Sequence, residues 1–151
     1  MAFDFAEMTR KHKAEVAARR ADPKPLIFIV NCKTPICEWP NSDWHYVGRA
    51  MRRSPIYRGS ELANPFHQRD HGRKEAIELY RRWLWDQQKA GYGPVIRELM
   101  DVLEYSLARK GISLGCWCAP KLCHAEVIKR CVEWMWSEGV RPEGWTVDKI
   151  Y

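Results

Sequence analysis

The chain has 151 residues, of which 46% are hydrophobic and eight are tryptophan, so it is long enough for one packed core and unlike a disordered protein. Its longest unbroken apolar run, residues 26–30, is far too short to cross a bilayer. The formal net charge is +6, and +5 of it falls between residues 49 and 74, which hold seven basic and two acidic residues. Such a segment favours an anionic partner, although charge runs also occur on solvated surfaces.

Three parts are expected along the chain. Residues 1–24 predict a polar, basic helical appendage, residues 25–139 a single α/β domain, and residues 140–151 a tail that folds back on it. The N-terminal stretch lacks the apolar core of a secretory signal, because charged residues interrupt it. The protein is therefore expected in the cytoplasm, without a membrane partner, and its six cysteines are expected to stay reduced.

The first half of the domain alternates short strands with irregular chain. The continuous apolar run 26–30 is typical of a strand covered on both faces and predicts a central strand of the sheet. A proline-rich and polar loop follows over residues 34–44, and residues 45–48 predict a second, short strand. Residues 50–72 show no period, and segments of this length inside compact domains usually serve a function.

The second half is helical apart from one strand. Apolar residues recur at steps of three and four over 73–88, and again between Pro94 and Gly111. A strand over 112–118 and a last helix that runs to Gly139 follow. This order predicts a single small Rossmann-like three-layer α/β domain with a short, largely parallel sheet. Ligands bind beyond the carboxyl ends of such strands, and here these ends carry Asn31, Arg49 and Cys116.

Residues 115–124 read Gly-Cys-Trp-Cys-Ala-Pro-Lys-Leu-Cys-His and collect three of the six cysteines with one of the five histidines. In a strand, Cys116 and Cys118 point to the same face, and Cys123 follows after a tight loop. With the imidazole of His124, the three sulfurs match the ligands of a tetrahedral Cys₃His zinc site. Zinc is the expected metal, and iron is the alternative.

Two other interpretations of the cluster stay open. If Cys123 lies in the first turn of the following helix, the helix start lowers its pKa, and His124 or Lys121 assists. The same residues would then supply a thiolate nucleophile or a phosphate cradle, so Cys116, Cys118, Cys123 and His124 are candidate catalytic residues as well as candidate ligands. Alternatively, Cys116 and Cys118 are small buried hydrophobes and His124 caps the helix.

A further set of residues is suited to holding an anionic ligand such as a nucleotide, a sugar phosphate or a nucleic acid. The candidates are the polar residues at strand ends and the basic residues nearby: Asn31, Arg49, Arg52, Arg53, Asn64 and Lys121. The two asparagines are equally suited to satisfying turns. Trp39 and Trp44 lie in the loop near the expected pocket and are candidates for stacking on a base.

Several of these motifs occur together in one known family. The stretch 115–124 resembles the bacterial and phage family filed as domain of unknown function 4326. Four further motifs support the resemblance over residues 30–133: Val30-Asn31, Tyr46-Val47-Gly48-Arg49, Asn64-Pro65-Phe66, and 73–77 with Tyr80. The chain departs from the pattern at Ala63 and at Ala125-Glu126, where the family has glycine or Gly-Asp. It is also similar to small α/β proteins of unknown function that carry a Cys-His-Arg motif.

The resemblance implies the fold, the site and a location in a bacterium or an infected host cell, but it implies no activity. Because the Cys/His cluster lies at a strand end near the basic segment, we expect a small intracellular enzyme that binds a nucleotide, a nucleoside or another phosphorylated ligand beside a metal or thiolate centre. One alternative is a non-enzymatic nucleic-acid-binding module with structural zinc. Another is a phage accessory protein that binds a host protein.

Overall fold

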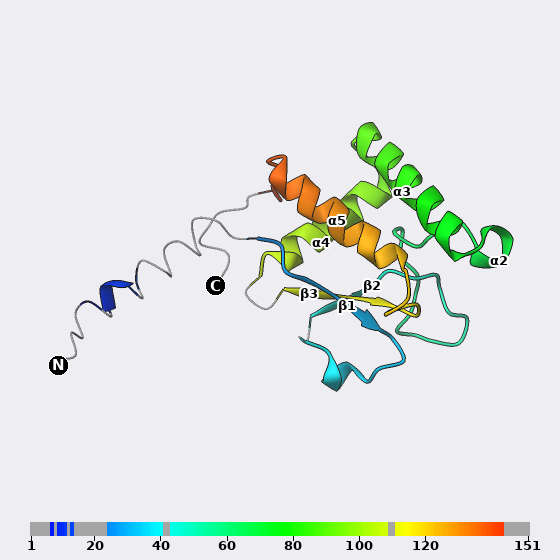
Figure 1. The fold of residues 1–151 in the computed structure, drawn as a ribbon, viewed down its shortest axis with the longest axis horizontal. Coiled ribbons are helices and arrows are strands. Elements are labelled where there is room, and N and C mark those ends of the chain that lie inside the picture. Colours follow the sequence, from blue (N-terminus) through cyan, green and yellow to red (C-terminus); the bar gives the residue numbers. More distant parts are fainter. Residues whose placement is uncertain are drawn as a thin grey trace.

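The computed structural model describes residues 24–40, 43–108 and 111–143, together with residues 7, 9–11 and 13 (Figure 1). Within these residues the strands are β1 (Ile27–Asn31), β2 (Trp44–Tyr46) and β3 (Ile112–Cys116). A short 3-10 helix, η1 (Ile36–Glu38), precedes β2. The α-helices are α2 (Gln68–His71), α3 (Arg73–Ala90), α4 (Pro94–Ser106) and α5 (His124–Ser137). The predicted α/β class is confirmed.

The three strands form one parallel sheet in the order β1-β3-β2. The register pairs Asn31 with Cys116 and Tyr46 with Gly115, so the carboxyl ends of all three strands meet at one edge, as expected. The central strand is β3, whose five residues are all buried. The prediction that β1 is central was wrong. Its apolar run has another cause, since α5 packs on β1 from one side and the 32–40 segment lies on the other.

The helices α3, α4 and α5 lie together on one side of the sheet (Figure 1). Each buries a stripe of apolar residues at helical spacing; in α3 the stripe is Ala76, Ile77, Tyr80 and Leu84. The left-handed backbone of Gly91 ends α3, and Pro94 begins α4, so the two helices form a hairpin. This packing builds the main core around Leu99, Val102, Leu103, Leu114, Ile128 and Val132.

The opposite face of the sheet is covered by the segment that contains η1 (Figure 1). At Gly115 a Cβ atom would lie 3.0 Å from Cys32 Sγ and 3.7 Å from the Trp39 ring, so the missing side chain lets this segment pack against β3. An aromatic cluster continues the layer and consists of Trp39, Trp44, Tyr46, Tyr57 and Trp117. Trp39 is buried within it and therefore offers no face to a base.

The predicted appendage 1–24 lies almost entirely outside the described residues, and so does most of the predicted tail 140–151. That division of the chain stays a prediction. The segment expected to be irregular, 50–72, is irregular except for the short helix α2. Among the described helices, none combines the length and apolarity needed to cross a membrane.

One partly buried carboxylate on α4 holds the middle of this irregular segment against the sheet. Glu98 accepts hydrogen bonds from His45 Nε2 of β2 at 2.6 Å, from the Ser60 hydroxyl, and from the backbone N–H of Glu61 at 2.7 Å. Burial raises the pKa of Glu98, but these hydrogen bonds outweigh it, so the pKa lies below its ordinary value. Glu98 thus connects α4, β2 and the loop that leads to the candidate site.

We expect Glu98→Gln to lower the free energy of unfolding near pH 7 by about 2–4 kcal/mol, because the amide cannot accept all three hydrogen bonds. Folding lowers the pKa of Glu98, so its contribution is complete above the unfolded pKa and is lost as the pH falls through the folded pKa. The difference between the two proteins should therefore shrink below about pH 4. Chemical denaturation at several pH values measures it.

The matched control is Asp101→Asn, which removes an exposed carboxylate from the same helix and should change stability by less than about 0.5 kcal/mol. Equal effects of the two substitutions would contradict the role of Glu98.

Candidate metal centre

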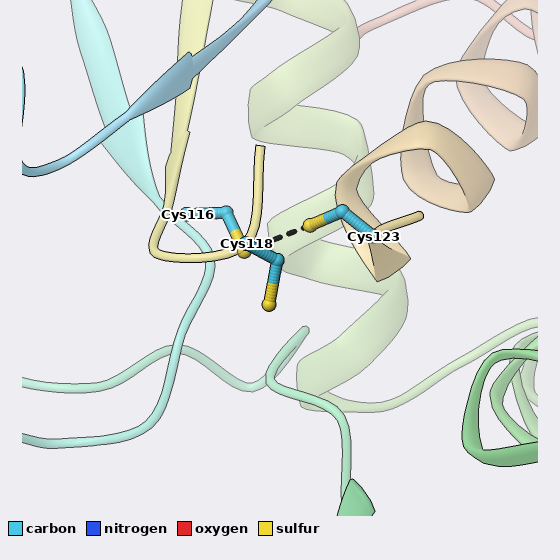
Figure 2. A group of neighbouring side chains, drawn as sticks. All are labelled: Cys116, Cys118 and Cys123. Atoms are coloured by element: carbon cyan, nitrogen blue, oxygen red, sulfur yellow. Dashed lines mark hydrogen bonds between the residues drawn. The ribbon is translucent and has the colours of Figure 1, made fainter. Parts of the chain in front are cut away.

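The three cysteines of the 115–124 stretch come together where β3 passes into α5. Cys116 ends the strand, Cys118 lies in the loop, and Cys123 is the N-cap residue of the helix. Their sulfur atoms lie within 4.8 Å of one another. Figure 2 shows the sulfurs of Cys116 and Cys123 facing each other, with the Cys118 side chain turned to one side of this pair. The predicted convergence of these cysteines is confirmed.

The imidazole of His124, at the first position of α5, lies beside two of the three sulfurs. Its Nε2–H donates to the Val47 carbonyl oxygen at 2.7 Å, and this contact fixes the orientation of the ring. Nδ1 faces the sulfurs at 3.9 Å from Cys116 and 3.7 Å from Cys123. Cys123 is extended and His124 is helical, and this change of backbone conformation aims two adjacent side chains at one point.

The hydrogen bond between the two facing thiols shifts their pKa values in opposite directions. The Cys123 thiol donates to Cys116 Sγ at 2.8 Å, and this hydrogen bond, reinforced by His124, lowers the pKa of Cys116 against the effect of burial. The same hydrogen bond and burial raise the pKa of Cys123. The helix start does act in the expected direction, because Cys123 Sγ accepts the backbone N–H of Ala125 at 3.4 Å and this lowers the pKa of Cys123, but the hydrogen bond to Cys116 and burial outweigh it.

Burial also separates the sulfurs by accessibility. Cys116 and Cys123 are only 3% and 1% exposed, and His124 is 7% exposed, whereas Cys118 is half-buried. A nucleophile must reach its substrate, so the thiolate favoured at Cys116 is poorly placed for attack. Cys118 Sγ accepts a hydrogen bond from Gln68 Nε2 of α2 at 3.5 Å. This sulfur connects the buried centre to the surface.

Asn31, a candidate ligand-binding residue, holds the cysteine loop in place. Its Nδ2 donates to the carbonyl oxygens of Ala119 at 2.5 Å and Trp117 at 3.4 Å, while its Oδ1 accepts the backbone N–H of Lys33 at 2.8 Å. The end of β1 is thereby joined to the loop that carries Cys118. Asn31 therefore fixes the position of the cysteine loop. These hydrogen bonds do not test the prediction that Asn31 also contacts a ligand.

Arg49 and Asn64 play a similar part on the other side of the centre. Arg49 Nη2 donates to the carbonyl oxygens of Asn64 and, at 3.2 Å, of Phe66. The Asn64 side chain is buried, accepts the backbone N–H of Phe66 at 2.9 Å and donates to the Ala76 carbonyl at 3.2 Å. Both residues therefore fix the loop before α2 through backbone hydrogen bonds.

A cavity of about 430 Å³ opens beside Cys118. Its inner wall contains Cys116, Cys118 and His124, with Trp117 and Tyr46 of the aromatic cluster next to them. Its rim carries Arg49, Asn64, His67, Gln68 and Arg69. The cavity thus combines sulfur atoms, aromatic rings and basic side chains within one space.

Three other predicted anion-binding residues lie elsewhere. Lys121 is exposed and borders a separate cavity of about 690 Å³, together with Asn31 and Glu126. Arg52 and Arg53 are exposed on a turn of the basic segment and line neither cavity. The structure therefore unites Arg49 and Asn64 with three of the four Cys/His candidates, but not Lys121, Arg52 or Arg53.

The sequence did not single out several residues that the structure brings to this cavity. Gln68, which contacts Cys118, gave no periodic or chemical signal of its own. Tyr46 and Phe66, which form walls, were visible as members of two motifs on which the family resemblance rests. His67 and Arg69 lie in the segment that the sequence marks as basic.

Comparison with known proteins gives one match. A family model described as Domain of unknown function (DUF4326) matches residues 30–134, which is more than half of the chain. No curated protein and no solved structure matches the chain.

We expect Asn31→Asp to lower the free energy of unfolding by about 1–3 kcal/mol, because it removes two N–H donors and places a charge against two carbonyl oxygens. Thermal or chemical unfolding checks this. The neighbouring substitution Lys33→Gln leaves the side-chain hydrogen bonds of Asn31 in place and should be nearly neutral. An Asn31→Asp variant as stable as the wild type would refute the clamping role.

Proposed function

The chain belongs to the family described as domain of unknown function 4326, which supplies no activity, and we propose from the geometry that it is a zinc-binding protein with an adjoining site for a phosphorylated, nucleotide-like ligand. Cys116, Cys118, Cys123 and His124 hold the metal. The observation that carries this proposal is the convergence of three sulfurs, two of which also face an oriented imidazole nitrogen.

The distances from His124 to two of the sulfurs support a tetrahedral site. Zinc bound at about 2.3 Å by sulfur and about 2.0 Å by nitrogen separates sulfur from nitrogen by roughly 3.6 Å and sulfur from sulfur by roughly 3.8 Å. His124 Nδ1 lies 3.9 and 3.7 Å from the two buried sulfurs, close to that separation. The Cys116–Cys123 distance of 2.8 Å is shorter than the zinc-bound separation, so these two sulfurs must move apart when the metal replaces their protons.

Hydrogen bonds behind the ligands support the same assignment. Metal-binding histidines usually donate their second N–H to a carbonyl or carboxylate oxygen, and here the Val47 carbonyl accepts from His124 Nε2. Gln68 donates to Cys118, and Ala125 donates its backbone N–H to Cys123. Such outer hydrogen bonds orient the ligands of a metal site.

The 430 Å³ cavity beside the centre supports the second half of the proposal. Arg49, Arg69 and His67 line its rim and suit a phosphate, while Trp117 and Tyr46 offer aromatic surface to a base. A nucleoside monophosphate matches this pairing of basic and aromatic groups.

An enzymatic role has one observation in its favour. Cys118 Sγ borders both the centre and the cavity, so a bound ligand lies against a zinc-bound sulfur.

The non-enzymatic alternative, nucleic-acid binding with structural zinc, is favoured by the exposed turn that carries Arg52 and Arg53. The two alternatives place the phosphate contacts at different arginines.

Protein purified without chelator should contain about one zinc ion per chain, and Cys116→Ser or Cys123→Ser should weaken zinc binding by at least about a hundredfold. Metal analysis and competition with a chromophoric chelator measure this. Cys37→Ser removes an exposed cysteine outside the cluster and should leave the zinc content unchanged. Zinc content that none of the cluster substitutions lowers would exclude the site.

AMP should bind the zinc-loaded protein, and Arg69→Ala should weaken this binding by about five- to tenfold, because Arg69 lines the cavity rim. Isothermal titration calorimetry with AMP, ribose 5-phosphate and adenosine separates the contributions of phosphate and base. Arg97→Ala is the matched control, since Arg97 is an exposed arginine of α4 that does not line the cavity.

The outcome for oligonucleotides separates the alternatives. Absence of AMP binding together with steeply salt-dependent binding of single-stranded DNA, weakened by Arg52→Ala and Arg53→Ala, would replace the nucleotide-like ligand with a nucleic acid.

A further inference from the structure

A largely apolar surface groove, distinct from the metal-side cavity, lies between α3 and α5. It encloses about 610 Å³. The two helices point the same way, because Arg73 donates to the Leu122 carbonyl at their amino ends and Trp85 contacts Trp134 near their carboxyl ends, with ring centroids 5.1 Å apart. Leu122, Trp85 and Trp134 are 49%, 47% and 40% exposed. These side chains leave a large apolar surface in contact with water.

The charged groups on this groove carry both signs. Lys74, Arg81 and Arg130 are basic, and Glu78 and Glu126 are acidic. Glu78 already pairs with Arg81 at 2.7 Å, whereas no ion pair within the described residues joins Lys74, Glu126 or Arg130. A groove for a strongly basic or strongly acidic partner would carry one sign. Mixed signs are what a surface needs to complement itself.

We infer that this groove is the interface between two copies of the chain, related by a two-fold axis that crosses α5. Glu126 and Arg130 are four residues apart on the same helix and both line the groove. If the axis passes at the level of Ile128, midway between them, the α5 helices run antiparallel. Each Glu126 then lies opposite the Arg130 of the other copy, which gives two equivalent ion pairs.

The same axis brings together the exposed apolar residues. Trp134 lies six residues after Ile128, roughly 9 Å along the helix, and Leu122 lies on the other side of Ile128, just before the start of α5 at His124. A two-fold axis at this level therefore places the Trp134 of one copy against the Leu122 of the other. Trp85 extends this contact, because it packs edge-on against Trp134 in its own chain. One position of the axis thus pairs the opposite charges and also brings the exposed apolar residues into contact.

The inference is independent of the proposed function, since the groups that make the contact are not metal ligands. Cys123 lines one end of the groove, but its sulfur points to Cys116. The two proposals can therefore fail separately.

Sedimentation velocity of the full chain at concentrations from about 5 to 500 μM tests the interface. The wild type should show a concentration-dependent dimer. Trp134→Glu should weaken the dimer by at least about tenfold, because it places a charge at the centre of the apolar contact. Tyr105→Glu is the matched control, since Tyr105 is 56% exposed on α4 and lies outside the groove.

Charge reversal tests the axis itself. Glu126→Arg should weaken the dimer by at least about tenfold, because it faces the Arg130 of the other copy, and adding Arg130→Glu should restore it to within about threefold. Circular dichroism confirms that the variants are folded. A wild type that stays monomeric at the highest concentration would overturn the inference, and so would a double variant no better than Glu126→Arg or a Tyr105→Glu effect equal to that of Trp134→Glu.

Discussion

Parallel pairing on both sides of β3 is the constraint on which the rest of the structure depends. Parallel strands require long connections between them, and the chain supplies these as the 32–43 segment and as the long path through α2, α3 and α4. Because all three strands point the same way, their carboxyl ends meet at one edge. The residues that follow these ends, from different parts of the chain, therefore become neighbours around Cys116.

Each neighbour of the centre fixes a different part of it. Asn31 ends β1 and holds the cysteine loop, while the carbonyl of Val47, just after β2, orients His124. The start of α5 then turns Cys123 and His124 toward the sulfur of Cys116. Backbone hydrogen bonds and one helix start thus set the positions of these side chains. A metal site with a preferred geometry requires ligands that are oriented in this way.

Much of this arrangement was readable from the sequence, because it follows from local pattern. The periodic stripes predicted α3, α4 and α5, and the cysteine motif between a strand and a helix predicted the site. The central position of β3 could not be predicted from the sequence. A strand that is covered on both faces has the same apolar residue types at the centre of a sheet as at its edge. Likewise, Arg49 and Asn64 bind backbone groups of a loop whose conformation is set by distant contacts, and their residue types alone suggested a ligand.

The proposed function depends on the joint binding of zinc by three sulfurs and one nitrogen. X-ray absorption spectroscopy at the zinc edge, on protein purified without chelator, tests this most directly. The account predicts a first shell of three sulfur atoms at about 2.3 Å and one nitrogen at about 2.0–2.1 Å. A shell of nitrogen and oxygen alone, or protein that holds no zinc when zinc is supplied, would contradict it.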